Sequence, residues 1–270
     1  MTYPFTISFC SIGLRNKPVT EALDQIARAG FRAVEILYPH LEKLNEEELH
    51  GVAAQCAKLG VKPIVIAPYF SFTRGAEWRQ RSIETARAVL KAAAILQVKK
   101  IRTFVDIGPD GLPSQRATAS DWAAACDGLR ELCELDPGSD FVVETHENTL
   151  ANTLPTIERL LKEVARPNLR LNFQANTDFM QRGFMQCLEI LYPHVSHMHW
   201  EQVCDGKPSA YIDEPGQIDF AQLIGWLKAK GYRGSASVEY CWQPVDEERI
   251  PSAVRFLDAI VAGLEAKSAC

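Results

Sequence analysis

The amino-acid sequence predicts an α/β chain that folds as one domain over residues 1–270, a single (β/α)8 barrel of the TIM type. Eight short apolar runs alternate with eight longer amphipathic stretches, and this alternation is typical of a parallel sheet with helical crossovers. The chain has 270 residues, and such a barrel typically needs about 250. No GxGxxG motif follows the first strand-like run, which disfavours a Rossmann domain.

Each predicted strand is a short run of apolar, mostly β-branched or aromatic residues that stands between two amphipathic stretches. The runs in chain order are FTISFC (5–10), RAVEIL (32–37), KPIVIA (62–67), KIRTFV (100–105), DFVVE (140–144), LRLNF (169–173), VSHMH (195–199) and SASVE (235–239). We expect these runs to pair side by side and to close into the barrel.

The predicted helices repeat apolar residues at a spacing of three to four, which suits one buried helix face. Gly30, Gly60 and Gly231 each follow such a stretch and precede a strand, where a left-handed helix cap is required. The helical segments are 18–29, 45–59, 77–97, 118–134, 153–165, 183–191, 219–230 and 246–265.

The composition excludes several classes of protein. The net charge is −5 and no long Lys/Arg cluster is present, which disfavours a nucleic-acid partner. No apolar run approaches the roughly 18 residues of a membrane helix, and the opening MTYPFTISFC lacks a secretory signal pattern. The eight cysteines form no CxxC motif, so we expect free thiols in a cytoplasmic protein.

Polar and ionisable residues stand where the last four predicted strands end. In a barrel of this kind, functional residues lie at the carboxyl ends of the strands and in the loops that follow. The four strands end near Glu144, Gln174, His199 and Glu239, respectively. Two carboxylates, one imidazole and one amide oxygen suit Mn²⁺, Mg²⁺, Co²⁺ or Zn²⁺. We therefore predict that these four residues hold one divalent metal ion.

At this point the sequence resembles the xylose isomerase-like barrels of sugar isomerases and epimerases. The resemblance covers nearly the whole chain and begins with ISFCSIG and GFRAVEI. Its sharper parts are VVETH, HMHWEQ and GYRGSASVEY, together with EPGQIDF (214–220), which is similar to the family's glycine-containing turn before the seventh helix. By resemblance, Glu144, His199 and Glu239 fall on three of the family's four metal ligands.

The end of the sixth strand departs from the family pattern. There the family normally has an aspartate ligand, often followed three residues later by a histidine, and the matching positions here are Gln174 and Thr177. A glutamine ligates through its neutral carbonyl oxygen, so the site carries one negative charge fewer. A shift of register that brings Asp178 to the site is the alternative.

The resemblance implies proton transfer at a carbon next to a carbonyl group. A divalent ion stabilises the enediolate that develops, while Glu144 and Glu239 remove and return the proton in an order that the sequence leaves open. His146 lies two residues beyond Glu144 and is a candidate for holding a substrate oxygen. Further candidates for substrate contacts, near other strand ends, are Gln202, Arg102 and Tyr38.

We therefore expect a metal-dependent isomerase or epimerase of a small sugar or keto-polyol, and by analogy with such barrels a homo-oligomer. One alternative is a metal-dependent dehydratase or lyase that eliminates a group β to the carbonyl of an oxidised sugar. Another is a non-catalytic sugar-binding barrel in which Gln174 marks a decayed metal site. Abasic-site endonucleases use the same barrel, but the net charge of −5 and the few histidines disfavour that activity.

Overall fold

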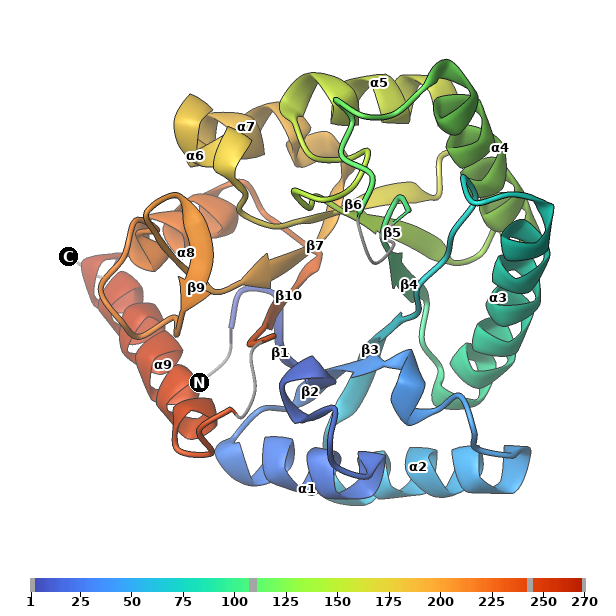
Figure 1. Cartoon of the computed structure of the whole chain (residues 1–270). Helices are drawn as coiled ribbons and strands as arrows, with labels where there is room; N and C mark the ends of the chain where they lie inside the picture. The colour runs from blue at the N-terminus through green and yellow to red at the C-terminus, as the bar shows by residue number, and fades with distance from the viewer. Residues whose placement is uncertain (1–2, 107–110, 242–244, 269–270) are drawn as a thin grey trace.

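The computed structural model of the protein describes residues 3–106, 111–241 and 245–268. In these residues, parallel strands close into a barrel in the order β1-β10-β7-β6-β5-β4-β3-β2, as Figure 1 shows in a view along the barrel. The barrel strands are β1 (Thr6–Cys10), β2 (Ala33–Leu37), β3 (Lys62–Ala67), β4 (Lys100–Thr103), β5 (Asp140–Glu144), β6 (Leu169–Phe173), β7 (Val195–Trp200) and β10 (Ser235–Val238). The predicted (β/α)8 barrel is confirmed.

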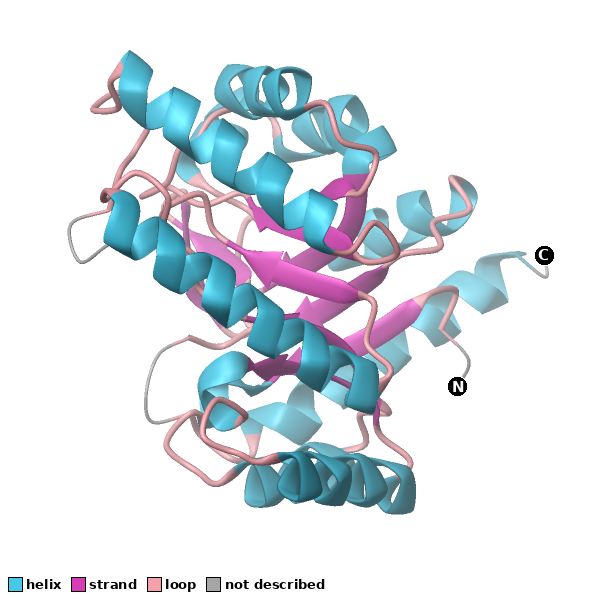
Figure 2. Ribbon diagram, turned by 90° about the vertical axis from the view of Figure 1, so that its right-hand side faces the viewer, coloured by secondary structure: helices cyan, strands magenta, loops and turns pink. Residues whose placement is uncertain are grey.

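Helices form an outer layer around the strands, and Figure 2 shows the two layers from the side. The helices are α1 (Val19–Ala29), α2 (Glu46–Leu59), α3 (Ala76–Leu96), α4 (Ala119–Leu135), α5 (Leu154–Val164), α6 (Thr177–Arg182), α7 (Phe184–Leu191), α8 (Phe220–Ala229) and α9 (Arg249–Ser268). Short 3-10 turns lie directly after β1, β2 and α7, and they are η1 (Ser11–Leu14), η2 (Tyr38–His40) and η3 (Tyr192–His194), respectively. Because α9 packs against both α8 and α1, the last helix closes the outer layer.

The ends of the first helices follow from local sequence. Gly30 and Gly60 end α1 and α2 with φ angles of 109° and 65°, which glycine adopts at little steric cost. Asn45 begins α2 by accepting a hydrogen bond from the backbone of Glu48, whose side chain accepts from the backbone of Asn45. These caps set where the chain leaves each helix and enters the next strand.

Two segments differ from the predicted elements. The predicted helix 183–191 is α7, and it is preceded by a separate helix, α6, which Asn176 caps by accepting from the backbone of Phe179. Gly183, with a φ angle of 105°, separates the two helices. After β7 the chain forms a hairpin of β8 (Gln202–Cys204) and β9 (Lys207–Ala210), whose strands are too short to show a clear period.

The interior of the barrel is polar, in contrast to the layer between barrel and helices. Apolar side chains such as Val34, Phe141 and Phe173 fill the space between the strands and the helices. Inside the barrel, the buried polar side chains include Ser8, Glu35, Arg102, His197, His199, Ser235 and Ser237. Charged groups at such depth require partners, so this network is a candidate for the functional site.

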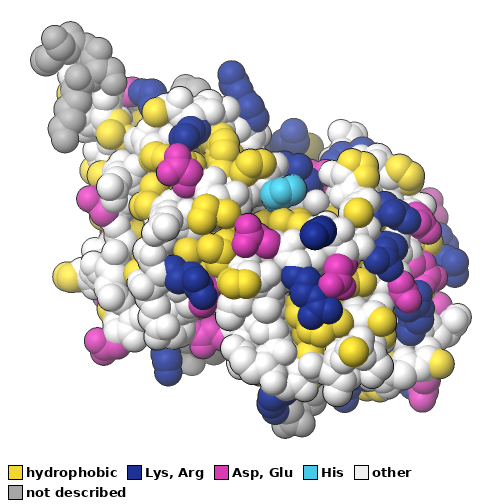
Figure 3. Space-filling view, turned by 90° about the horizontal axis from the view of Figure 1, so that it is seen from above, with side chains coloured by type: hydrophobic (Ala, Val, Ile, Leu, Met, Phe, Trp, Pro, Cys, Tyr) yellow, Lys and Arg dark blue, Asp and Glu magenta, His cyan; other side chains and the backbone are white. Residues whose placement is uncertain are grey.

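The outer surface carries mixed charges. On the face over α5 and α7, Lys and Arg side chains lie among Asp and Glu side chains, and neither sign dominates (Figure 3). Within the described ranges, none of the helices is both long enough and apolar enough to span a bilayer.

Candidate metal centre and active site

The structure brings the predicted metal ligands together at the carboxyl ends of neighbouring strands. Glu144 is the last residue of β5, Gln174 follows β6, His199 lies in β7 and Glu239 follows β10. These strands are successive neighbours in the barrel, so the four side chains meet on one side of its mouth. All four are buried, with at most 5% of their surface exposed.

Three of these residues face one another closely. The Nδ1 atom of His199 lies 3.0 Å from Glu239 Oε2 and 3.5 Å from Glu144 Oε2. One ligand atom from each residue lies within 4.8 Å of the others. Within the described part of the chain, the buried Nδ1 atom has no hydrogen-bond partner. A buried nitrogen between two carboxylates has the donor chemistry of a divalent metal site, so these residues fit such an ion.

Gln174 is oriented by two carboxylates. Its Nε2 atom donates to Glu201 Oε1 at 2.8 Å and to Glu239 Oε2 at 3.4 Å. Its buried carbonyl oxygen has no hydrogen-bond partner among the described residues. A carbonyl oxygen of this kind is a neutral ligand for a hard cation, so Gln174 fits as a fourth ligand that carries no charge.

The alternative register at the end of β6 is wrong. Asp178 lies in α6, where its carboxylate accepts from the backbone of Leu154 and from Arg182, at 2.9 Å in each case. The hydroxyl of Thr177 donates to Glu147. Asp178 is thus engaged at the start of α5 and not at the barrel mouth.

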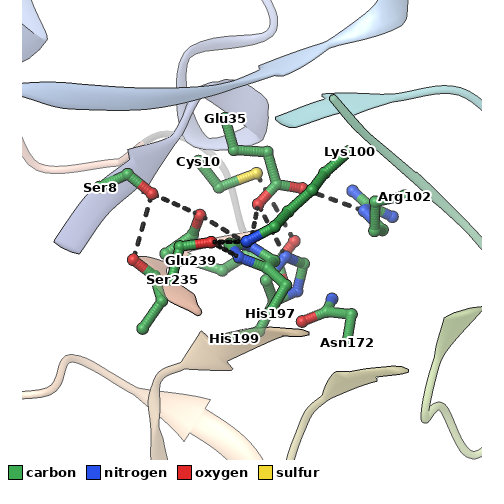
Figure 4. A network of polar contacts seen from close by, with 12 residues as sticks. Ser8, Cys10, Glu35, Lys100, Arg102, Asn172, His197, His199, Ser235 and Glu239 are labelled. Carbon is green, nitrogen blue, oxygen red and sulfur yellow. Dashed lines mark hydrogen bonds and ion pairs between the residues drawn. The ribbon is translucent and has the colours of Figure 1, made fainter. Parts of the chain in front are cut away.

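Two buried glutamates outside the predicted set belong to the same polar cluster. Glu35, in β2, points at His197 and His199 in Figure 4 and is fully buried. Glu201, directly after β7, exposes 2% of its surface and accepts from Gln174. Glu35 had a detectable signal in the sequence, because a carboxylate in the middle of the apolar run AVEIL is buried in a barrel and needs partners.

Arg102 lies inside this cluster. Its Nε atom donates to Glu35 Oε1 at 3.0 Å, and its Nη1 atom lies 3.0 Å from Glu144 Oε2. The rings of Tyr69 and Phe104 stand with their centroids 5.9 Å and 5.1 Å from its guanidinium carbon. Arg102 therefore joins two carboxylates, and its predicted contact with substrate stays a prediction.

His146 lies in the loop after β5, at the edge of a cavity of about 240 Å³. Its ring meets the ring of Phe104 edge-on, with the centroids 5.1 Å apart. Gln174 and Glu201 line the same cavity, together with Lys207 of the hairpin. The predicted role of His146 in holding a substrate oxygen stays a prediction.

The remaining two candidates are placed differently. Both polar atoms of the Gln202 amide engage the backbone: Nε2 donates to the carbonyl of Ile218, and Oε1 accepts from the amides of Val203 and Ile218. Gln202 thus links the segment 214–220 to the hairpin through hydrogen bonds. Tyr38 lies in the 3-10 turn after β2 and exposes 8% of its surface. Substrate contacts of both residues stay predictions.

The acidic residues of the cluster differ in their proton affinity. Burial favours the protonated form of Glu35, but His199, His197 and Arg102 hold its pKa well below the ordinary value. Burial raises the pKa of Glu144, which Arg102 and His199 oppose. Burial, with the charge of Glu239 nearby, raises the pKa of Glu201 to about 8.

The pKa values of the two buried histidines, His197 and His199, shift in opposite directions. Burial lowers the pKa of His197 to about 4, although Glu35 opposes this shift. Burial acts in the same sense on His199, but the surrounding carboxylates, Glu239 first, raise its pKa well above the ordinary value. The surroundings of His199 thus favour positive charge there, as they do on Arg102 in the same cluster.

Known proteins resemble this chain in sequence and in fold. A 3-dehydroshikimate dehydratase from Bacillus anthracis is 27% identical over an alignment of 223 residues that covers 78% of this chain and 76% of that protein. The crystal structure of a probable 3-DHS dehydratase from the same organism has a TM-score of 0.79 at 20% identity and covers 94% of this chain and 99% of its own. The crystal structure of D-psicose 3-epimerase from Clostridium cellulolyticum H10 has a TM-score of 0.78 at 17% identity. It covers 96% of this chain and 99% of its own.

The two structural likenesses, at such low identity, show the shared fold. A model of the family described as xylose isomerase-like TIM barrel matches residues 23–260. This match covers most of the chain, including Glu144, Gln174, His199 and Glu239. The chain therefore belongs to the xylose isomerase-like TIM barrel family.

Proposed function

We propose that the chain is a metal-dependent isomerase or epimerase that transfers a proton at the carbon next to the carbonyl of a small sugar or keto-polyol. The observation that carries this proposal is the pair of buried glutamates, Glu144 and Glu239, that face the same nitrogen of His199 at 3.5 Å and 3.0 Å. Two carboxylates beside one cation site supply a base to remove a proton and an acid to return it.

A divalent metal ion held by Glu144, His199 and Glu239, with the carbonyl oxygen of Gln174, would supply stabilisation of the negative charge that develops on the substrate oxygen. The protein holds both glutamates in place for proton transfer. Asn172 donates to Glu144 Oε2 at 3.3 Å, and the thiol of Cys10 lies 3.8 Å from Glu239 Oε1.

The size of the adjoining cavity supports a small substrate. Its volume of about 240 Å³ lies just below the roughly 300–1,000 Å³ of pockets for drug-sized ligands. His146, Glu147, Asn148 and Lys207 offer polar groups at its wall, as a molecule with several hydroxyl groups requires.

The test replaces each glutamate by its uncharged isostere. Glu144→Gln and Glu239→Gln are each expected to lower turnover by roughly 10²- to 10⁴-fold, because each removes one proton-transferring group. Exchange of substrate hydrogen for deuterium from D₂O, followed by mass spectrometry over a panel of ketoses and keto acids, measures the step directly. Glu189→Gln, on the surface beside Lys230, is the matched control. Wild-type rates in either site variant would refute the two-glutamate mechanism.

Dehydration is the second candidate, because the relative with 27% identity carries the name of a dehydratase. The site also holds Glu201, a third buried carboxyl that lines the cavity and suits protonation of a leaving hydroxyl. Product analysis separates the two reactions. A dehydratase releases water and forms a conjugated product that absorbs in the ultraviolet, whereas an isomerase conserves the mass of its substrate.

A non-catalytic barrel gives a third, distinct outcome in the same assays. It predicts that a sugar raises the melting temperature with or without metal and that no substrate in the panel turns over. Turnover that a chelator abolishes would exclude it.

A further inference from the structure

Glu35 stands at the centre of the polar network inside the barrel, on β2, away from the strands that carry the candidate ligands. Its Oε2 atom lies 3.0 Å from Nε2 of His197 and 3.0 Å from Nε2 of His199. Its Oε1 atom accepts from Nε of Arg102 at 3.0 Å. Glu35, Arg102 and His197 are fully buried. A carboxylate at this depth costs several kcal/mol unless its partners are well placed, so its contacts call for explanation.

We infer that Glu35 is a positioning residue: it turns His199 so that Nδ1 is the atom offered to the metal ion, and it holds Glu144 in place through Arg102. This inference rests on the proposed function, because it presupposes an ion at Glu144, His199 and Glu239.

The orientation of His199 follows from hydrogen-bond chemistry. An ionised carboxylate accepts hydrogen bonds and cannot donate them, so Nε2 of His199 carries the hydrogen that Glu35 accepts. The lone pair of the neutral ring then lies on Nδ1, the atom that faces Glu239 and Glu144. A metal-bound histidine commonly donates its other ring N–H to a carboxylate, which fixes the tautomer and the ring orientation.

The second branch of the network leads to another ligand. Nη1 of Arg102 lies 3.0 Å from Glu144 Oε2, and the side chain of Asn172 donates to the same oxygen. Glu35 is therefore joined to a ligand on β7 directly and to a ligand on β5 through one guanidinium. Loss of its charge is expected to loosen both.

A second possible metal site also includes His199, but it would use a different ring nitrogen of this residue. Cys10, Glu35 and His199 also bring ligand atoms within 4.8 Å of one another. An ion there would take Nε2 of His199, the atom that faces Glu35, and not Nδ1. Because both oxygens of Glu35 already accept from Arg102, His197 and His199, the geometry favours the site with Glu144 and Glu239.

The first measurement needs no substitution at Glu35. Wild-type protein labelled with ¹⁵N in the histidine rings is loaded with Zn²⁺, and NMR determines which ring nitrogen of each histidine carries hydrogen. The signals of His199 are those that a His199→Gln sample lacks. We expect Nε2 of His199 to be protonated and Nδ1 to be bound to metal. Metal on Nε2 would overturn the inference and point to the second possible metal site.

The second measurement is the affinity for Mn²⁺ and Zn²⁺ by calorimetry. Glu35→Gln is expected to weaken binding by roughly 10- to 100-fold, because the amide cannot accept from both histidines and from Arg102 at once. Ser8→Ala is the matched control, since Ser8 is equally buried inside the barrel but contacts Ala236 and Ser237 instead. If Glu35→Gln fails to fold because Arg102 has lost one of its two carboxylate partners, the double variant Glu35→Gln/Arg102→Gln removes both charges, and the same loss of affinity is expected.

The outcomes separate the inference from the function on which it rests. Wild-type binding of metal with unchanged affinity in the Glu35 variants overturns the positioning role and leaves the proposed function standing. Failure of the wild-type protein to bind any divalent metal refutes the proposed metal-dependent function, and the positioning role with it.

Discussion

At the scale of single residues, the charge of the candidate site depends on position 174. The amide of Gln174 donates to Glu201 and to Glu239, so it supplies a hydrogen bond to two buried carboxyl groups. A carboxylate at this position would add attraction for a cation but would lose both hydrogen bonds. We therefore expect Gln174 to favour the stability of the metal-free protein over affinity for a metal ion.

Substitution Gln174→Glu is expected to raise the affinity for Mn²⁺ at least about tenfold, because a charged ligand replaces a neutral one. In the presence of EDTA the same variant is expected to melt at a lower temperature than wild type, because a third buried carboxyl group then stands beside Glu201 and Glu239 without the hydrogen bonds that the amide donates. Calorimetry and thermal unfolding measure the two effects. Gln186→Glu, on the exposed side of α7, is the control and should change neither. Unchanged affinity for Mn²⁺ would show that position 174 does not touch the metal.

Lys100, which is not one of the candidate metal ligands, is expected to make the stability of the protein depend on pH. Its Nζ atom donates to the carbonyl of Ser196 and to the hydroxyl of Ser235, and burial lowers its pKa to about 8. Between that value and its ordinary pKa of 10.5, the unfolded chain binds more protons than the folded chain. Stability supplied by this position therefore rises with pH in that window and is lost as the pH falls through about 8.

Lys100→Met removes this titration. The free energy of unfolding of wild type, minus that of the variant, is expected to rise by up to about 1.4 kcal/mol per pH unit above pH 8. Urea unfolding of both proteins at about pH 7.5 and about pH 9.5 tests it, and the subtraction cancels the other titrating groups. A difference that stays constant, or that falls with pH, contradicts the lowered pKa.

At the scale of elements, irregular strand pairing accompanies the buried polar groups. The register between β2 and β3 shifts between Val34 and Glu35, and the register between β6 and β7 shifts between Leu171 and Asn172. Bulges of this kind change the direction of side chains and occur often beside active sites. Both shifts fall at residues of the cluster around His199.

The packing of α4 on the loop after β3 gives an element-scale prediction. A Cβ atom on Gly128 of α4 would lie 2.1 Å from the ring of Phe72. Gly128→Ala is therefore expected to destabilise the protein by roughly 1–3 kcal/mol. Gly51→Ala in α2, where no atom lies within 4 Å of the new carbon, should instead stabilise by about 0.5–1 kcal/mol. Urea unfolding compares the two, and equal effects would contradict this packing.

At the scale of the whole molecule, a metal ion would join strands from half of the barrel. Glu144, His199 and Glu239 come from β5, β7 and the end of β10, so an ion bound to all three stabilises the closed form. Addition of Mn²⁺ at a hundred times its dissociation constant is expected to add about 2.7 kcal/mol to the free energy of unfolding, and EDTA should reverse it. Thermal unfolding of wild type and Glu239→Ala checks this. An equal response in the variant would place the metal elsewhere.

Much of the fold was predictable because periodicity and glycine caps are local signals. Each of the eight predicted runs coincides with a strand of the barrel to within two residues at either end, and Gly30 and Gly60 end helices as expected. The hairpin at 202–210 and the helix α6 were missed because short elements do not complete a period. The candidate ligands were predictable in part, because strand ends in a parallel barrel converge.

The sequence by itself determined the barrel and the set of polar residues at its carboxyl end, since both follow from alternation along the chain and from the order of the strands. Only the tertiary structure decided how these groups pair. Glu35 is far from His199 and Arg102 in the chain, and the closing of the barrel alone brings their charges within 3.0 Å. Tertiary structure likewise commits the amide of Gln202 to the backbone and Asp178 to the start of α5. The physical reason is that hydrogen bonds and ion pairs depend on distances across the barrel, which no local pattern records.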